Sequence, residues 1–430
     1  MREIGVGIIG FGTVGTGVVK ILQGNGDLIA ERMGGRLAIR KIADIDLERK
    51  RDVEVPSFLL TTDAHEVIRD PGVDVVVELI GGEEPARSFI LEAIREGKHV
   101  VTANKALLAH WGKEIFEAAK ERGVQVGFEA SVGGGIPIIR SLTEGLVANR
   151  IRAIFGILNG TSNYILTRMT EQGEEFGEAL REAQSLGYAE ADPRLDVEGI
   201  DAAHKLTILA SLASGSWVEF ERVYVEGITR ITPLDIQFSM EFGYRIKLLA
   251  IAKITPEGVE LRVHPTMLPK DHLLAQVGGV YNAIYVTGDV VGPTMFYGQG
   301  AGGLAAGSAV VSDLVSVARR IMGGVKGEGL LFSEGPVTYK AIEDLVCPYY
   351  LRFTAVDRPG VLSKISGILG ANEISIASVI QKGREVNGAV PVVMMTHEAK
   401  EEAVKRALEE IDRLDVIKDR TTLIRVEEGS

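Results

Sequence analysis

A glycine-rich turn at the start of the chain constrains the fold more than any other feature. The apolar run IGVGIIG predicts a buried strand, and it leads directly into GFGTVG and the helical pattern TVGTGVVKILQ. In such a unit, Gly10 permits a tight turn, Gly12 lets the backbone approach a ligand, and Gly15 lets the helix pack on the strand. Amide groups at the helix N-terminus favour a pyrophosphate. The turn therefore predicts a dinucleotide site, with an ordinary strand-to-helix connection as the alternative.

The first third of the chain repeats this alternation of strands and helices. The apolar runs VDVVVELI and HVVTA lack a two-residue alternation of polar and apolar residues, as expected for strands buried on both faces. Helical patterns such as ARSFILEAIREG and KEIFEAAKERG separate the strands. This order predicts a parallel sheet in an α/β domain of the Rossmann type, over residues 1–132.

The remainder of the chain predicts two further domains. Residues 133–322 mix strand-like and helical patterns and predict an α+β domain, whose helix near 303–322 is a candidate to pack back on the first domain. Residues 323–347 are rich in glycine and predict a linker. Residues 348–430 follow the order strand, helix, strand, strand, helix, strand, which predicts a ferredoxin-like βαββαβ domain.

Composition limits the class of protein. A chain of 430 residues is expected to form two or three domains, and 46% hydrophobic residues exclude a mainly disordered chain. The net charge of −12 argues against nucleic acid and anionic membranes as partners. The single cysteine, Cys347, excludes an internal disulfide and fits a reducing compartment. No apolar stretch approaches bilayer length, so we expect a cytoplasmic protein.

Polar residues follow two predicted strands, at the edge where parallel strands meet a ligand crevice. Asp44 ends RKIADID and is an acceptor for a ribose 2′-hydroxyl, which favours NAD, whereas Arg40 and Lys41 suit the 2′-phosphate of NADP. The choice of cofactor therefore stays open. In VVTANK, Lys105 is either a solvated loop residue or, as its position favours, a contact of the substrate or of the nicotinamide end.

Two segments after the first domain have both a structural and a functional interpretation. In FEASVGGGIPII, the carboxylate of Glu129 and carbonyls turned inward by three glycines suit a hard cation, although the residues alone favour a plain hinge. In ILNGTSNY, Asn159 and Thr161 stand where a helix begins. They either cap that helix or form an anion site suited to an amino-acid carboxylate.

The stretch GYAEADPRLDVEGIDAAHK concentrates five carboxylates before an apolar helix. Asp201 and Lys205 are four residues apart and share a helix face. If the loop with Glu190 and Asp196 folds over a cleft, its carboxylates hold a substrate ammonium and favour the charged form of Lys205, a proton donor. A solvated acidic loop is the alternative, which these residues alone favour slightly. His204 is expected to be a packed or surface imidazole.

Several strings of the sequence together resemble the homoserine dehydrogenase family. The matches run from residue 5 to about 315, and the most specific is LGYAEADPRLDVEGIDAAHKL. The others are GFGTVG, TANK, FEASVGGGIP, GILNGTSNYIL and GAGGLAAGSAVVSDL. The later segment DRPGVLSKISGILGANEISI resembles an ACT domain, a regulatory module for small ligands.

The resemblance implies an NAD(P)-dependent interconversion of L-homoserine and L-aspartate 4-semialdehyde, in threonine, methionine and isoleucine biosynthesis. It makes Lys205 the proton donor to the aldehyde oxygen and Lys105 a contact of substrate and nicotinamide. Glu190 and Asp201 would hold the amino-acid substrate, with Asp196 nearby. The residues along the cofactor would be Gly12, Thr13, Val14, Gly187 and Gly302.

The resemblance also implies a monovalent cation, Na⁺ or K⁺, between Glu129 and the carbonyls of Val132, Gly134 and Ile136, which reverses the preference for a hinge. It gives the second domain substrate binding, catalysis and dimerisation, and it implies a homo-oligomer, either a dimer or a tetramer. In the ACT segment an amino-acid effector, threonine by expectation, would bind at a strand-to-helix turn. The residues at that turn are Asp357 and Gly360.

Two alternatives belong to other classes of function. One is a different amino-acid dehydrogenase that shares the Rossmann fold. The other is an amino-acid sensor that has kept the fold without turnover. The joint presence of Lys105, Lys205, Glu190 and Asp201 argues against the sensor.

Overall fold

The computed structural model describes residues 2–327, 332–333, 335–382 and 388–428. Contacts divide the chain into two compact units. Unit 1 comprises Met1–Leu158, Asp201–Val223 and Tyr281–Val337, and unit 2 comprises Asn159–Ile200, Tyr224–Val280 and Thr338–Ser430. Residues predicted as one second domain thus contribute to both units. The domain boundaries at residues 132 and 322 remain predictions. The predicted linker at 323–347 lies partly outside the described residues.

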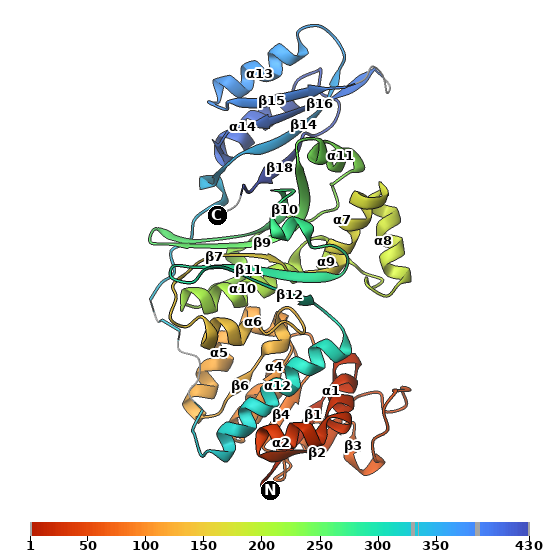
Figure 1. Cartoon of the computed structure of the whole chain (residues 1–430), viewed down its shortest axis with the longest axis vertical. Coiled ribbons are helices and arrows are strands. Elements are labelled where there is room, and N and C mark those ends of the chain that lie inside the picture. The colour runs from red at the N-terminus through yellow and green to blue at the C-terminus, as the bar shows by residue number, and fades with distance from the viewer. Residues whose placement is uncertain (1, 328–331, 334, 383–387, 429–430) are drawn as a thin grey trace. The chain divides into compact units, whose positions relative to one another are not determined.

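A six-stranded parallel sheet forms the first part of unit 1 and confirms the predicted Rossmann-type domain (Figure 1). In spatial order its strands are β3 (Leu60–Thr61), β2 (Gly35–Ala43), β1 (Arg2–Ile9), β4 (Val75–Glu78), β5 (His99–Thr102) and β6 (Val126–Gly127). Its helices are α1 (Thr13–Gly24), α2 (Gly26–Met33), α3 (Ala64–Arg69), α4 (Ala86–Arg95) and α5 (Lys105–Arg122). The central strands β4 and β5 are buried, as strands covered on both faces should be.

A late helix, α12 (Gly303–Met322), packs on the sheet and on α1 (Figure 1). The two helices approach closely because glycines face one another. A Cβ atom added to Gly17 would lie 2.1 Å from the carbonyl oxygen of Gly303. Val310 and Leu314 of α12 share a hydrophobic core with Val18. The predicted return of this helix to the first domain is therefore present in the structure.

The rest of unit 1 contains an antiparallel group of three strands and a buried helix. The strands are β12 (Gly292–Gln299), β11 (Tyr281–Gly288) and β7 (Ile151–Ile157), in that spatial order. Helix α10 (Ile200–Ser214) is buried at eleven consecutive positions from Asp201 to Ser211. In the segment IPIIRSLTEGL, the short helix α6 spans Ile138–Arg140 and continues as a π-helical turn over Ser141–Gly145.

Unit 2 is built on a long antiparallel hairpin of β9 (Tyr244–Thr255) and β10 (Gly258–Pro269). The short strand β8 (Tyr224–Val225) pairs with β10. The helices of this part are α7 (Gly160–Gln172), α8 (Phe176–Ser185), α9 (Arg194–Val197) and α11 (Pro233–Glu241). Gly258 has a φ of 147°, which lets the chain turn sharply between the two long strands.

The C-terminal part of unit 2 confirms the predicted ferredoxin-like domain. Its elements are β14 (Tyr349–Val356), α13 (Val361–Ala371), β15 (Ile376–Gln381), β16 (Ala389–Thr396), α14 (Glu401–Asp412) and β18 (Thr422–Val426). Alternate residues of β14, such as Leu351 and Phe353, share a core with Ile365 of α13 and Val404 of α14. The spatial order β18-β14-β16-β15 is that of a βαββαβ sheet.

One strand joins the ferredoxin-like domain to the hairpin of unit 2. Strand β18 lies between β14 and β10, and its parallel pairing with β10 includes Arg425 opposite Thr266. Buried ion pairs accompany this junction and are described below. Among the described residues, no helix has the length and apolar character needed to span a bilayer.

Candidate functional site

Two lysines from different parts of unit 1 meet at one buried carboxylate. The Nζ atom of Lys205 donates a hydrogen bond to Oδ2 of Asp201 at 2.7 Å. The Nζ atom of Lys105 lies 3.4 Å from Oδ1 of the same carboxylate. Asp201 and Lys205 are buried, whereas the Lys105 side chain is 44% exposed. The predicted convergence of the two lysines is therefore present in the structure.

Helix positions explain this convergence. Asp201 and Lys205 occupy successive turns of α10, so both side chains reach the same side of the helix. Lys105 is the first residue of α5, directly after the end of β5. Asn104 fixes that turn: its side chain accepts a hydrogen bond from the Leu107 amide and donates to the Gly82 carbonyl. The lysine is thus held at the carboxyl edge of the parallel sheet.

A backbone carbonyl and an asparagine complete the surroundings of Lys205. The Nζ atom donates to the carbonyl oxygen of Leu158 at 2.6 Å, and Nδ2 of Asn282 donates to the same oxygen at 3.0 Å. Asn282 is fully buried on β11, and its Oδ1 atom has no hydrogen-bond partner among the described residues. The sequence reasoning missed Asn282. Its only signal is a lone amide in the otherwise apolar run of a strand.

A buried glutamate at the same edge of the sheet was also missed. Glu78 ends β4, and burial raises the pKa of its carboxyl group. Its oxygens accept hydrogen bonds from the Thr102 hydroxyl at 2.7 Å and the Ile80 amide at 2.9 Å. Glu78 therefore ties the ends of β4 and β5 together. A carboxylate directly after the three valines of the run VDVVVELI is the signal that the sequence offered.

The glycine-rich turn has the open backbone that a dinucleotide requires. Gly10 has a φ of 105°, and a Cβ atom on Gly15 would lie 2.2 Å from the Gly10 carbonyl oxygen. A Cβ atom on Gly12 would meet nothing within 4 Å, so the space beside it is free. Thr13 and Val14 begin α1. Gly302, with a φ of 122°, directly precedes α12 within the same unit.

The two candidates for cofactor choice lie in different surroundings. Asp44 follows β2, and its Oδ2 accepts a hydrogen bond from the Phe11 amide in the glycine-rich turn at 2.6 Å. Arg40 lies within β2 and pairs with Glu3 of β1 at 2.5 Å. Arg51, which the sequence reasoning did not single out, stacks on Phe11 and lies 3.5 Å from Asp44. Of these groups, Asp44 and Arg51 contact the turn.

A second polar cluster lies in unit 2. Asn159 caps helix α7, and its Nδ2 donates to Oδ1 of Asp196 at 2.7 Å. The hydroxyl of Thr161 donates to the Tyr188 carbonyl at 2.6 Å. Glu190 is exposed on the loop between α8 and α9. The structure thus brings Asn159 and Asp196 together, with Thr161 bonded to the acidic loop.

The remaining predicted residues of unit 2 lie at turns. Gly187 has a φ of 75° and follows the end of α8. Gly360 has a φ of 92°, directly follows Pro359 and is the N-cap residue of α13. The Asp357 amide, just after β14, donates to the Gly388 carbonyl at 3.4 Å. Both glycines adopt a conformation that other residues rarely take.

The segment predicted to hold a cation is buried and acidic. The two oxygens of Glu129 accept hydrogen bonds from the amides of Ile139 and Arg140, and burial raises the pKa of the Glu129 carboxyl group. Oδ2 of Asp313 accepts from the Glu129 amide, and burial raises the pKa of Asp313 to about 7. Gly134 is left-handed, with a φ of 57°. No cluster of three or more potential His, Cys, Asp or Glu metal ligands occurs in the described part of the chain.

His204 is a packed imidazole. Its ring contacts the rings of His110 and Phe220, with centroids 5.3 Å and 4.7 Å away. Burial lowers the pKa of His204 to about 4, so the ring is neutral at neutral pH. A neutral, packed ring agrees with the structural role expected from the sequence.

Comparison with known proteins identifies the family. Residues 10–129 match the family model "Homoserine dehydrogenase, NAD binding domain", residues 137–315 match "Homoserine dehydrogenase", and residues 349–416 match "ACT domain". The homoserine dehydrogenase of Pseudomonas aeruginosa is 47% identical over 436 residues, which cover 100% of both chains. The chain belongs to the homoserine dehydrogenase family. It is therefore an NAD(P)-dependent oxidoreductase acting on a CH–OH group.

Solved structures agree with this assignment. A crystal structure of a homoserine dehydrogenase from Thiobacillus denitrificans matches with a TM-score of 0.92 at 46% identity, over 100% of this chain and 99% of that chain. A hyperthermophilic archaeal homoserine dehydrogenase in complex with NADPH matches with a TM-score of 0.63 at 28% identity, over 74% of this chain and 98% of that chain. Similarity to dehydrogenases over the full length does not favour a sensor without turnover.

Proposed function

We propose that the chain interconverts L-homoserine and L-aspartate 4-semialdehyde, with Lys205 as the proton donor in the reductive direction. The observation that supports this most is the contact of two lysine ammonium groups with one buried carboxylate, Asp201. Reduction of an aldehyde develops negative charge on its oxygen. Cations fixed in advance beside that oxygen stabilise the charge where it forms.

The hydrogen bonds of Lys205 give it an orientation suited to this role. An ammonium group has three N–H donors. Two of them are used by Asp201 and by the Leu158 carbonyl. The third is available to the substrate oxygen, and Lys105 adds a second positive charge. In the oxidative direction the neutral amine of Lys205 accepts the proton of the substrate hydroxyl.

We assign the amino-acid end of the substrate to the acidic loop and to the start of α7. The carboxylates of Glu190 and Asp196 suit an α-ammonium group, and the resemblance to the family assigns Asp201 to substrate binding as well. Asn159 and Thr161 have polar side chains at the helix start, where amide groups favour an α-carboxylate. The bond between Asn159 and Asp196 supports the assignment, because it ties the helix start to the acidic loop.

The glycine-rich turn fits an NAD(P) pyrophosphate, because its backbone is open at Gly12 and lies at the start of α1. When bound, NAD(P)H supplies the hydride. We assign the pyrophosphate to the turn and the ribose to Asp44, with Lys105 at the nicotinamide end. The remaining residues proposed along the cofactor are Gly10, Thr13, Val14, Gly15, Arg40, Gly187 and Gly302.

A monovalent cation, Na⁺ or K⁺, fits the segment around Glu129. Burial disfavours the ionised forms of both Glu129 and the neighbouring Asp313. A bound cation offsets that cost. We propose as its ligands the Glu129 carboxylate and the carbonyls of Val132, Gly134 and Ile136. The bound cation would hold the backbone of the turn that follows the first domain in one conformation.

We further propose that the ACT domain regulates the enzyme in a homo-oligomer, either a dimer or a tetramer. The turn with Asp357 and Gly360 precedes α13, where helix N-terminal amides suit the carboxylate of an amino acid such as threonine. Asp357→Ala, at the proposed effector turn, is expected to leave catalysis and remove threonine inhibition. Unchanged activity of the full chain at millimolar threonine would contradict this part of the proposal.

A single assay tests the catalytic proposal. The purified chain is expected to reduce NAD⁺ or NADP⁺ in the presence of L-homoserine, measured by NAD(P)H absorbance. The variant Lys205→Ala is the control for contaminating activity. Absence of turnover with either cofactor would overturn the assignment and favour the amino-acid sensor. Turnover of other amino alcohols in preference to homoserine would favour a different dehydrogenase.

A further inference from the structure

The loop between β4 and α4, residues 79–85, runs from the glycine-rich turn to the start of α5. A Cβ atom on Gly10 would lie 2.7 Å from the carbonyl carbon of Leu79, so the loop begins in close contact with that turn. Further along, the Gly82 carbonyl accepts a hydrogen bond from Nδ2 of Asn104, the N-cap residue of α5, at 2.6 Å. The loop therefore borders both the turn assigned to the pyrophosphate and the helix start that carries the lysine assigned to the nicotinamide end.

Two glutamates hold this loop near its two ends. At its start, Oε1 of Glu78 accepts hydrogen bonds from the amides of Ile80 and Gly81, at 2.9 Å and 3.4 Å. Gly81 and Gly82 follow with φ angles of 74° and 72°. Glycine loses more conformational freedom on ordering than any other residue, so a loop built on two glycines needs fixed ends. Glu83 supplies the second fixed point.

The carboxylate of Glu83 reaches two residues of α5. Its Oε2 accepts a hydrogen bond from Nε1 of Trp111 at 2.8 Å, and its Oε1 lies 3.1 Å from Nδ1 of His110. The Trp111 ring is itself supported, because the guanidinium group of Arg87 lies over it, 4.3 Å from the ring centroid. Arg87 in turn pairs with Glu114 of α5 at 2.7 Å. Glu83 thus fastens the loop to the helix that begins with the proposed nicotinamide contact.

His110 extends this connection to the helix that carries the proposed proton donor. Its ring lies edge-on to the ring of His204, with centroids 5.3 Å apart, and both rings contact Phe220. His204 directly precedes Lys205 on α10. The contacts from Glu83 through His110 to His204 therefore join the loop to both of the helices that bear the site lysines.

The next residue of the loop, Glu84, has the same charge but different partners. Its Oε2 accepts a hydrogen bond from the Ser88 hydroxyl at 2.8 Å, and its Oε1 accepts one from Arg87 at 3.3 Å. Both partners lie in the first turn of α4. The two glutamate side chains are similarly exposed, at 44% for Glu83 and 52% for Glu84. Glu84 is therefore a matched control for the charge and the exposure of Glu83.

We propose that Glu83 is a positioning residue for the nicotinamide half of the cofactor, because it fixes the loop 79–85 on α5 beside Lys105. The inference deepens the proposed function, since it rests on the assignment of Lys105 to the nicotinamide end. It does not depend on which alcohol is oxidised. Without Glu83 the loop must be ordered when the ring binds, and that ordering costs affinity. The glycine-rich turn is formed by other residues, so the adenosine and pyrophosphate parts should bind as before.

Calorimetric titration of the full-length protein tests this role. The probes are NADH, NADPH and ADP-ribose, which lacks the nicotinamide ring; its 2′-phosphate form is used where NADPH binds more tightly than NADH. Glu83→Ala should weaken the tighter dinucleotide about tenfold and leave the affinity for the ring-free fragment unchanged. The kcat for homoserine oxidation should fall about tenfold as well, because the ring is misplaced. Glu84→Ala should leave both affinities and kcat at wild-type values.

The partner on α5 provides a second variant that keeps Glu83 in place. Trp111→Phe removes the N–H donor and keeps an aromatic ring beside Arg87. It should reproduce part of the loss in dinucleotide affinity. The double variant should bind no more weakly than Glu83→Ala alone, because the two side chains form one contact. Glu83→Gln keeps an acceptor for Trp111 and should restore most of the affinity.

Four results would overturn the proposed role of Glu83. Wild-type dinucleotide affinity in Glu83→Ala would show that the loop needs no such anchor. An equal loss for the dinucleotide and the ring-free fragment, with a lower melting temperature, would make the residue merely structural. An equal effect of Glu84→Ala would assign the change to the charge of the loop, and additive losses in the double variant would separate Glu83 from Trp111. Absence of homoserine turnover in the wild-type chain would instead overturn the proposed reaction, and the binding comparison would still decide the role of Glu83.

Discussion

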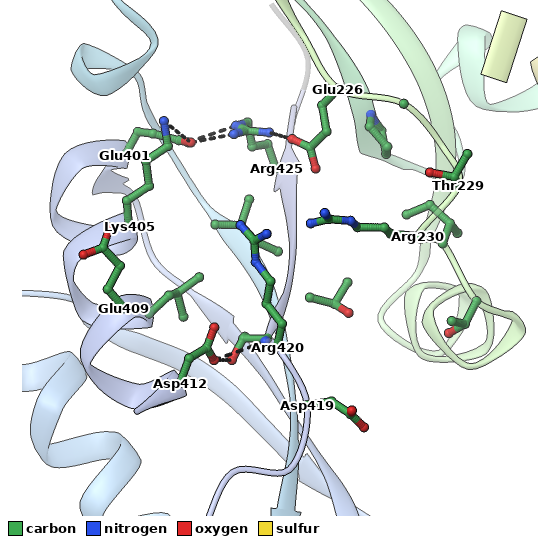
Figure 2. Close-up of a pocket in the computed structure, with 18 of the residues that line it drawn as sticks. Glu226, Thr229, Arg230, Glu401, Lys405, Glu409, Asp412, Asp419, Arg420 and Arg425 are labelled. Carbon is green, nitrogen blue, oxygen red and sulfur yellow. Dashed lines mark hydrogen bonds and ion pairs between the residues drawn. The ribbon is translucent and has the colours of Figure 1, made fainter. Parts of the chain in front are cut away.

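Both units bury charged side chains, but they balance them differently. In unit 1, two lysine ammonium groups contact the single carboxylate of Asp201. In the described part of unit 2, each buried arginine contacts two acidic side chains. Arg425 contacts Glu401 and Glu226 (Figure 2), and Arg262 contacts Glu260 and Glu427.

The difference separates a site for chemistry from a structural junction. A matched set of buried charges holds two elements in one arrangement, as Arg425 does between α14 and the segment after β8. An excess of one sign marks a candidate for ligand binding or reaction. On this criterion we propose the group around Asp201 as the reactive one. The substitutions below are ordered from the largest expected effect to the smallest.

Removing Lys205, the proposed proton donor, is expected to have the largest effect. Lys205→Ala should lower kcat by about 10²–10⁴-fold, because the charge on the substrate oxygen loses its proton source. The affinity for NADPH, measured by fluorescence titration, should stay near the wild-type value. Near-normal turnover in this variant would show that Lys205 is not the proton donor. It would also contradict the proposed difference between the charged groups of the two units.

Removing a carboxylate from the matched network of unit 2 should act on stability instead. Glu401 is fully buried, and its oxygens accept hydrogen bonds from Arg425 and from the Tyr349 hydroxyl. Glu401→Gln removes the buried partner of the Arg425 guanidinium, leaves only the partly exposed Glu226 beside it, and should lower the free energy of unfolding by about 3–5 kcal/mol. Urea unfolding measures this. Glu402→Gln, at an exposed position of the same helix, is the matched control. An equal loss of stability in both variants would contradict the structural role of the buried pair.

One lysine of unit 2 is an exception that sharpens the comparison. Lys247 is 4% exposed on β9, and its Nζ donates to the Val277 carbonyl at 2.5 Å and to Oδ1 of Asn163. Burial lowers the pKa of Lys247 to about 8. Among the described residues, the hydrogen-bond partners of Lys247 are neutral groups, so no hydrogen-bonded carboxylate offsets the cost of burying its charged form.

The stability of the protein should depend on pH through this lysine. Between about pH 8 and its usual value of 10.5, the folded chain has released the Lys247 proton and the unfolded chain still holds it. The unfolded state thus binds more protons, and the free energy of unfolding rises with pH. Relative to Lys247→Met, the wild-type chain should gain about 1–3 kcal/mol between pH 7 and pH 10. Parallel pH profiles of the two proteins would contradict the lowered pKa.

The fold could be predicted from the sequence because its signals are local. The strand before Gly10, the apolar runs of β4 and β5, and the βαββαβ order near the C-terminus each depend on neighbouring residues. The site could be predicted in part for the same reason. Asp201 and Lys205 share a helix face, which spacing alone indicates.

The rest of the site depends on contacts between distant parts of the chain. Asn282 reaches the Leu158 carbonyl across 124 residues, and no spacing rule connects the two. The matched charges of unit 2 are similar, because Glu401 and Arg425 belong to different elements of the domain while Glu226 lies some 200 positions earlier. Charge patterns in the sequence do not distinguish such a buried pair from a solvated one. Residues of this kind became visible only in the folded chain.

Asn282 offers the last and smallest test, because it belongs to the reactive unit without carrying charge. It donates to the Leu158 carbonyl that also accepts from Lys205, so it fixes the acceptor that orients the ammonium group. Asn282→Ala should lower kcat about tenfold through misplacement of Lys205, with little change in the KM for NADPH. Asn282→Asp keeps the shape but removes the donor. In the reductive direction it should raise the pH at which kcat falls, since an added negative charge favours the protonated form of Lys205. A purely structural residue would lower the melting temperature in both variants and leave the pH profile unmoved. That result would place Asn282 with the matched polar groups of unit 2 and restrict the reactive cluster to the two lysines and Asp201.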